Sequence, residues 1–182
     1  MSKQVIDRII RTLCLLLFVI CVNSTLVSAA AKSDSLQLIG KVFNNKSVVR
    51  GLIVNVYQDN EKIKSVHVKN SNRFRLNVPY HSMLTIEITA PDFHAKRFIL
   101  DSNVPKTVRN TLKYEFDIDI FKEEEIVGVN TSILDFPVGL VAFDEKKKIF
   151  KRDKKYTKRM KKVYLNLWNE AEMIKRSSEL NE

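Results

Sequence analysis

The feature that most constrains the fold is an alternation of apolar and polar side chains, with a period of two residues, between Leu36 and Ile120. It is clearest from Leu112 to Ile120, where apolar residues alternate with charged ones. Successive side chains of a strand point to opposite faces, so this period predicts half-buried β-strands and not helices. Seven short strands are predicted, over 36–42, 52–56, 62–68, 74–78, 84–88, 95–100 and 112–120.

The residues between these segments are typical of turns. Asp59 and Asn60 tolerate left-handed backbone geometry and predict a hairpin between the second and third strands. Pro79 and Pro91 lie at strand ends, where a missing amide hydrogen costs least. With 45% hydrophobic residues and few Gly and Cys, the composition excludes a disordered chain, a fibre and a disulfide scaffold. The pattern therefore predicts a mainly β protein: an antiparallel seven-stranded β-sandwich.

Four segments of this region resemble a known family, the carboxypeptidase regulatory-like domain, which is a transthyretin-like, Ig-like sandwich of bacterial envelope proteins. The segments are 38–42, 51–57, 72–76 and 90–93, and the resemblance covers residues 36–121. Two glycines expected from the family pattern are Asn72 and Asp92 in this chain. The resemblance implies an accessory binding module without catalytic activity and gives no active site.

The first 30 residues predict a signal peptide. Basic residues in 1–12 precede an unbroken apolar run over 13–22, and small residues follow at Ser28, Ala29, Ala30 and Ala31. Cleavage is expected after Ala30 or Ala31; an uncleaved membrane anchor is the alternative. The protein is therefore expected to be exported, to the periplasm, the outer cell envelope or the medium.

Both cysteines, Cys14 and Cys21, lie in this leader, so the exported chain would carry no thiol. Lipid attachment at Cys21 is disfavoured because Ile20, not a small residue, precedes it.

Residues 122–182 predict a tail with a small hairpin and a helix. The apolar run over 138–143 would pair with Ile149 and Phe150. From Lys154 onward the apolar residues recur every three or four positions, which predicts a helix with Asp153 as N-cap. They are Tyr156, Met160, Val163, Tyr164, Leu167, Ala171 and Ile174. This stripe must be buried, either on the sandwich or on a membrane surface or partner protein.

The same segment carries most of the net charge of +10. We call its eleven Lys and Arg side chains the basic cluster: Lys146, Lys147, Lys148, Lys151, Arg152, Lys154, Lys155, Lys158, Arg159, Lys161 and Lys162. We expect it to contact an anionic partner, namely an envelope protein, a polysaccharide or an anionic lipid surface. A nucleic-acid partner is not expected, because export removes the protein from intracellular nucleic acid.

No motif in the sequence predicts catalysis or a cofactor. The histidines are His67, His81 and His94, and no metal-ligand spacing or phosphate-binding glycine loop accompanies them. The prediction is therefore a protein that is not an enzyme, without cofactor, metal site or identified small-molecule substrate. Two alternatives remain: a small exported hydrolase using His81 or His94, or a purely structural module whose charge serves solubility.

Overall fold

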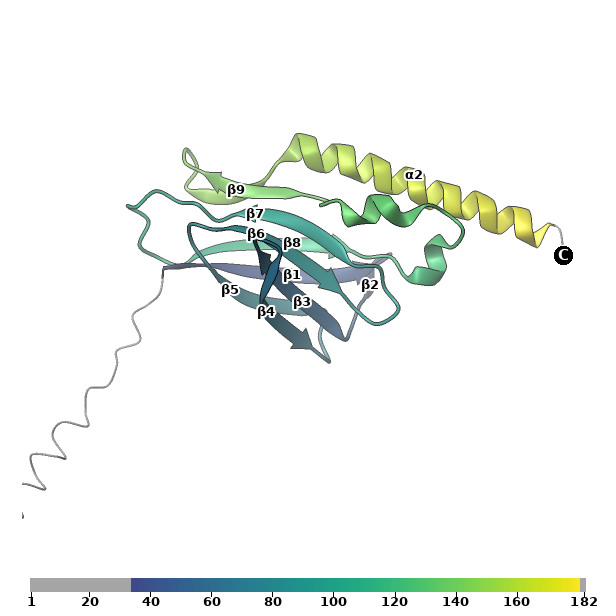
Figure 1. Cartoon of the computed structure of the whole chain (residues 1–182), viewed down its shortest axis with the longest axis horizontal. Coiled ribbons are helices and arrows are strands. Elements are labelled where there is room, and N and C mark those ends of the chain that lie inside the picture. Colours follow the sequence, from purple (N-terminus) through teal and green to yellow (C-terminus); the bar gives the residue numbers. More distant parts are fainter. Residues whose placement is uncertain (1–33, 181–182) are drawn as a thin grey trace, which may run out of the picture. The chain divides into compact units, whose positions relative to one another are not determined.

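The computed structural model describes residues 34–180, which are mainly β with one long helix at the C-terminal end (Figure 1). The predicted leader over 1–30 lies outside the described residues. In the part that is described, no helix has the length and hydrophobicity needed to cross a membrane. The elements are β1 (Ser35–Asn44), β2 (Ser47–Val48), β3 (Leu52–Gln58), β4 (Glu61–Val68), β5 (Arg73–Pro79), β6 (Met83–Thr89), β7 (Lys96–Asp101), β8 (Leu112–Asp119), η2 (Glu123–Ile126), η3 (Thr131–Asp135), β9 (Leu140–Asp144), β10 (Ile149–Arg152) and α2 (Lys154–Glu179).

All seven predicted strands are present, and the alternation corresponds to burial. In β5, Phe74, Leu76 and Val78 are buried while the residues between them are exposed. The hairpin between β3 and β4 turns at Asp59 and Asn60, whose φ angles are 51° and 66°. The two-residue strand β2 was not predicted.

The strands form two sheets. One sheet has β1 at its centre, paired antiparallel with β5 and with the short β2, and parallel with β8. The other has six strands in the order β10, β9, β7, β6, β3, β4. Apolar residues of both sheets belong to one hydrophobic core, which includes Leu38, Phe74, Val54, Ile86 and Leu100.

The prediction of a purely antiparallel arrangement is wrong at two places. β8 runs parallel to β1 over eight residue pairs, from Leu36 beside Leu112 to Phe43 beside Asp119. β9 runs parallel to β7, with Ile99 beside Leu140. Parallel neighbours cannot be joined by a tight hairpin and are separated by a long stretch of chain. The period of a single strand does not indicate which distant strand it pairs with. The predicted hairpin of β9 and β10 is confirmed, but it extends the six-stranded sheet and is not a separate unit.

Helix α2 begins where the sequence predicts, and the Asp153 side chain accepts a hydrogen bond from the Tyr156 amide at 2.9 Å. Its stripe buries Met160, Tyr164, Leu167 and Ala171 in a second apolar cluster. That cluster is completed by Ile126 and Leu134 of the two 3-10 helices and by partly buried neighbours, so the helix packs on its own chain. Ile174 differs from the prediction, because it is 40% exposed. Figure 1 shows α2 running along the β9 side of the protein.

Candidate functional site

All eleven residues of the basic cluster are exposed. The chain places them on the β9–β10 turn, on β10 and on the first turns of α2. In the first turns of α2, Met160 is the buried residue, so the opposite face of the helix is turned to solvent. The apolar stripe thus leaves the cations of α2 on the outer face.

Five members of the basic cluster line one groove of about 850 Å³. They are Lys147, Lys151, Arg152, Lys154 and Lys155. The other lining residues are mostly apolar and come from β6, β7 and β9: Met83, Ile99, Leu140, Val141, Ala142 and Phe143. The groove, which we call the basic groove, therefore combines cationic and apolar surface.

Two carboxylates also line the basic groove, and both are already engaged. Asp153 caps α2, as described above, and Asp101 accepts hydrogen bonds from the amide of Asn103 at 3.0 Å and from its side chain at 2.7 Å. Five cations against two carboxylates leave the lining with an excess of positive charge. An anionic ligand would therefore be attracted to it.

A third carboxylate, Asp144, pairs with one of the five cations. Lys151 donates to Asp144 through its Nζ, and the backbone amides of Lys146 and Lys147 donate to the same carboxylate at 2.9 and 3.2 Å. The hydrogen bond from Lys151 is the largest cause that lowers the pKa of Asp144. This pair fixes the β9–β10 turn and reduces the charge that Lys151 offers a ligand. Sequence reasoning counted Lys151 as a free cation and missed the pair.

The remaining members of the basic cluster lie outside this groove. Lys161, together with Arg152, lines a second pocket of about 180 Å³. The guanidinium of Arg159 lies over the Tyr156 ring, 5.1 Å from its centroid. Lys146, Lys148, Lys158 and Lys162 line neither of these two pockets. The structure thus divides a charge run that looked uniform in the sequence.

The second pocket contains Lys96, which sequence reasoning did not select. It lies between β7, β8 and α2, and its apolar lining includes Phe98, Phe116 and Met160. Lys96 is half-buried there, and its Nζ donates to the Asp119 carbonyl oxygen. The Nζ lies 5.0 Å from the ring centroid of Phe121 and 4.5 Å from that of Tyr164. These partners are up to 68 positions away in the chain, so no local pattern predicts the site.

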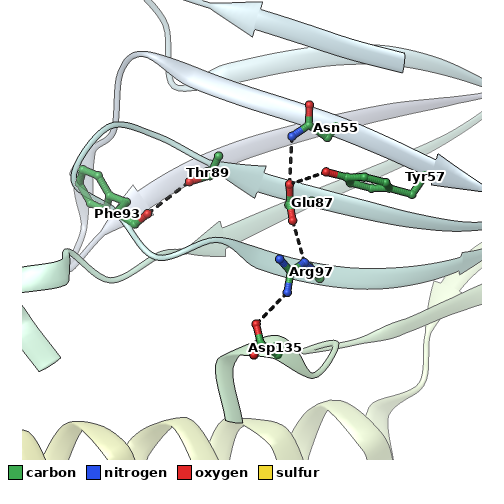
Figure 2. A network of polar contacts seen from close by, with 7 residues as sticks. All are labelled: Asn55, Tyr57, Glu87, Thr89, Phe93, Arg97 and Asp135. Carbon is green, nitrogen blue, oxygen red and sulfur yellow. Dashed lines mark hydrogen bonds and ion pairs between the residues drawn. The ribbon is translucent and has the colours of Figure 1, made fainter. Parts of the chain in front are cut away.

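A polar network joins three strands of the six-stranded sheet to η3, and its central residues, Asn55 and Glu87, are buried (Figure 2). The Glu87 carboxylate accepts hydrogen bonds from Asn55 Nδ2 at 2.9 Å, Tyr57 hydroxyl at 3.0 Å and Arg97 Nε at 2.7 Å. Arg97 also donates to Asp135 of η3 at 3.1 Å. Every member has at least one hydrogen-bond partner within the chain, although the buried Oδ1 of Asn55 has none. We therefore regard the network as structural: it ties β3, β6 and β7 to the 3-10 helix that packs under α2.

The structure does not bring the histidines of the hydrolase alternative together. His81 lies in the turn before β6, and His94 lies in the loop after it, so about 20 Å of strand separates their positions. Neither lines the basic groove or the Lys96 pocket. Within residues 34–180, no group of three or more His, Cys, Asp or Glu side chains is arranged to hold a metal ion.

No protein-family model and no curated protein matches this chain. Among solved structures, 3-chlorocatechol 1,2-dioxygenase from Rhodococcus opacus 1CP is similar with a TM-score of 0.36 and 10% identity, covering 52% of this chain and 62% of that one. Chlorocatechol 1,2-dioxygenase from Pseudomonas putida has a TM-score of 0.34 and 10% identity, covering 50% and 62%. Hydroxyquinol 1,2-dioxygenase from Pseudomonas putida DLL-E4 has a TM-score of 0.31 and 11% identity, covering 51% and 59%.

These findings correct the prediction that the protein is not an enzyme. All three of these similar structures are enzymes, so that prediction is contradicted and we do not carry it further. The TM-scores are below 0.5 and less than two thirds of each neighbour is covered, so the likeness assigns no reaction and no active-site residue to this chain.

Proposed function

We propose that the protein is an exported envelope protein whose basic groove binds an anionic lipid surface. The observation that carries this proposal is the composition of the groove: five cations, of which Lys151 is paired with Asp144, beside an apolar lining from β6, β7 and β9. Lipid headgroups supply phosphate charge for the cations, and the adjoining acyl region accepts apolar side chains. Met83, which is 55% exposed in the groove, is suited to that apolar contact.

The apolar lining favours a lipid over the two other partners expected from the sequence. A polysaccharide offers hydroxyl and carboxylate groups, which would leave Ile99, Leu140 and Phe143 without an apolar contact. A protein partner would have to match the groove with an acidic, apolar segment, and nothing in the described residues indicates one. Export remains part of the proposal and is supported by the leader pattern over 1–30.

We also propose that the two sheets pack face to face as a sandwich of the carboxypeptidase regulatory-like kind. Two observations support this: both sheets contribute to one core, and Asp92, which replaces an expected glycine, has a φ of 66°. An experimental structure in which the two sheets do not face each other across that core would contradict it.

The lipid proposal is tested with vesicles of phosphatidylcholine containing 30% phosphatidylglycerol, against vesicles of phosphatidylcholine alone. A variant carrying Lys154→Glu and Lys155→Glu removes two groove cations, and acidic residues are favourable in the first turn of a helix, so folding should be preserved. Each cation near an anionic surface contributes about 1 kcal/mol, so the variant should bind at least about 30-fold more weakly. Wild-type binding should also fall as salt is raised.

The matched control carries Lys69→Glu and Lys106→Glu, which change the net charge equally at exposed positions outside the groove. It should retain most of the wild-type binding. Equal losses in both variants would show that only net charge matters and would overturn the groove as the site. Binding to an anionic polysaccharide with none to the anionic vesicles would overturn the lipid proposal. Finding the protein in the cytoplasm after cell fractionation would overturn export.

A further inference from the structure

The Lys96 pocket has the size and lining of a small-molecule site. Its volume of about 180 Å³ is close to that of the ~150 Å³ protein cavity that accommodates benzene. Aromatic and aliphatic side chains of β7, β8 and α2 form much of the wall, while charged groups lie around it. A molecule about the size of benzene, with roughly six non-hydrogen atoms, would fill it.

One amine in this pocket is set apart from the lysines of the basic cluster. Lys96 is half-buried, whereas every lysine of the basic cluster is exposed. Its Nζ is held by the Asp119 carbonyl oxygen and by the rings of Phe121 and Tyr164. Anchoring from two elements fixes the position of the amine at the pocket wall, which a solvent-exposed lysine on a flexible stem does not achieve.

The other charged groups that line this pocket come from three elements. β8 contributes Asp117 and Asp119, α2 contributes Lys161, and β10 contributes Arg152; the hydroxyl-bearing rings are Tyr114 and Tyr164. Burial lowers the pKa of Lys96 to about 8, Asp119 opposes that shift and Lys161 adds to it. A free amine is therefore accessible near neutral pH, and a neighbouring cation is a known way of activating a nucleophilic lysine.

We propose that Lys96 is a nucleophilic amine that condenses with the carbonyl group of a small oxo acid whose carboxylate is bound by Arg152 and Lys161. The Lys96 nitrogen lone pair forms a bond to the carbonyl carbon. The carbonyl oxygen leaves as water with the two amine protons, and a carbon–nitrogen double bond remains. No oxidant or reductant is consumed. Arg152 and Lys161 are the two cations of the lining that could pair with the carboxylate of such a ligand, where they would compete with Asp117 and Asp119, and the 180 Å³ volume limits the ligand's size.

This inference is independent of the lipid proposal, because it rests on a different pocket. Arg152 lines both, but the amine and its aromatic neighbours do not line the basic groove. Loss of vesicle binding in the Lys154→Glu, Lys155→Glu variant would leave the reaction at Lys96 unchanged. The two proposals can therefore fail separately.

The test uses glyoxylate as the oxo acid and sodium cyanoborohydride to trap the imine as a stable secondary amine, followed by peptide mass mapping. At pH 8, half of an amine with a pKa of about 8 is unprotonated, against roughly 0.4% of an ordinary lysine amine, a difference of about 100-fold. Lys96 should therefore be labelled at least tenfold faster than the exposed Lys158. Its labelling rate should rise with pH up to about 8 and then level off.

Three variants are compared with wild type in the labelling assay. Lys96→Met should remove the fast adduct. Lys161→Met should move the pH midpoint of Lys96 labelling upward and raise the glyoxylate concentration needed for half-maximal labelling of Lys96. Lys158→Met, which alters an exposed helix lysine outside the pocket, should change neither. Because the mapping compares two lysines of the wild-type protein, it gives a result even if Lys96→Met does not fold. Labelling of Lys96 no faster than that of Lys158 would overturn the proposal.

Discussion

Replacing Glu87 by Gln should reveal how much the polar network of Figure 2 contributes to stability. Gln keeps the size of the side chain and can still offer an oxygen to Asn55 and Tyr57. Its amide nitrogen would then face Arg97 Nε, a donor, where the carboxylate oxygen now accepts at 2.7 Å. The substitution therefore removes one charge and one hydrogen bond without leaving a cavity.

The expected cost follows from the burial of the pair. Removing one partner of a buried ion pair costs about 3–5 kcal/mol. The Glu87 side chain is 11% exposed, but that of Arg97 is 31% exposed and retains Asp135 as a partner. Solvent thus weakens the penalty, and we expect a loss of about 2–3 kcal/mol in the free energy of unfolding.

The assay is urea unfolding at pH 7, with the slope m expected to stay unchanged because the surface exposed on unfolding is the same. Glu115→Gln, which alters an exposed carboxylate on β8, is the control and should change stability by less than about 0.5 kcal/mol. A loss below about 0.5 kcal/mol for Glu87→Gln would refute the view that this network joins the sheet to η3.

The pH dependence provides a second check on Glu87. Burial raises the pKa of this carboxyl, but the hydrogen bonds from Asn55, Arg97 and Tyr57 outweigh it, so the pKa lies below its usual value. A carboxyl with a lowered pKa in the folded state stabilises the protein above its unfolded pKa and loses that contribution as the pH falls through the folded value. The difference in free energy of unfolding between wild type and Glu87→Gln should therefore become smaller below about pH 4.

Two further predictions concern the helix N-cap and the half-buried amine. Asp153→Ala removes the hydrogen bond to the Tyr156 amide, so thermal unfolding should show a loss of about 1 kcal/mol in stability. The same change removes a carboxylate from the basic groove, so the variant should bind anionic vesicles more tightly than wild type does. Weaker binding would contradict the groove as the site. Because the pKa of Lys96 falls to about 8 on folding, the unfolded chain holds that proton more tightly, and wild-type stability should rise between about pH 8 and 10.5. Lys96→Met should be more stable than wild type by roughly 2 kcal/mol at pH 7 in urea unfolding, with no advantage left near pH 11; equal stability at pH 7 would refute this.

Much of the fold could be predicted from the sequence because the deciding signals are local. The two-residue period fixes which side of each strand is buried, and the spacing of three and four fixes the buried side of α2. The parallel pairing of β8 with β1 was missed because it joins residues 76 positions apart, such as Leu36 and Leu112. Local periodicity carries no information about which strand becomes a neighbour.

The site was predictable only in part, for the same reason. The charge run from Lys146 to Lys162 identified the basic surface, but not the apolar lining that β6 and β7 supply to it. Asn55 and Glu87 are polar residues between buried neighbours, which is a visible signal. That they meet each other depends on the register of β3 against β6, which only the structure shows.

Strand β10 is the last strand of its sheet, and the opposite end of that sheet is β4. Both edges are rich in positive charge: Lys151 and Arg152 on β10, and Lys62 and Lys64 on β4. A second copy that added its own edge strand would place cations opposite cations, which disfavours growth of the sheet from one molecule to the next. The cations of β10 that line the basic groove, together with those of β4, thus also protect an open sheet from self-association.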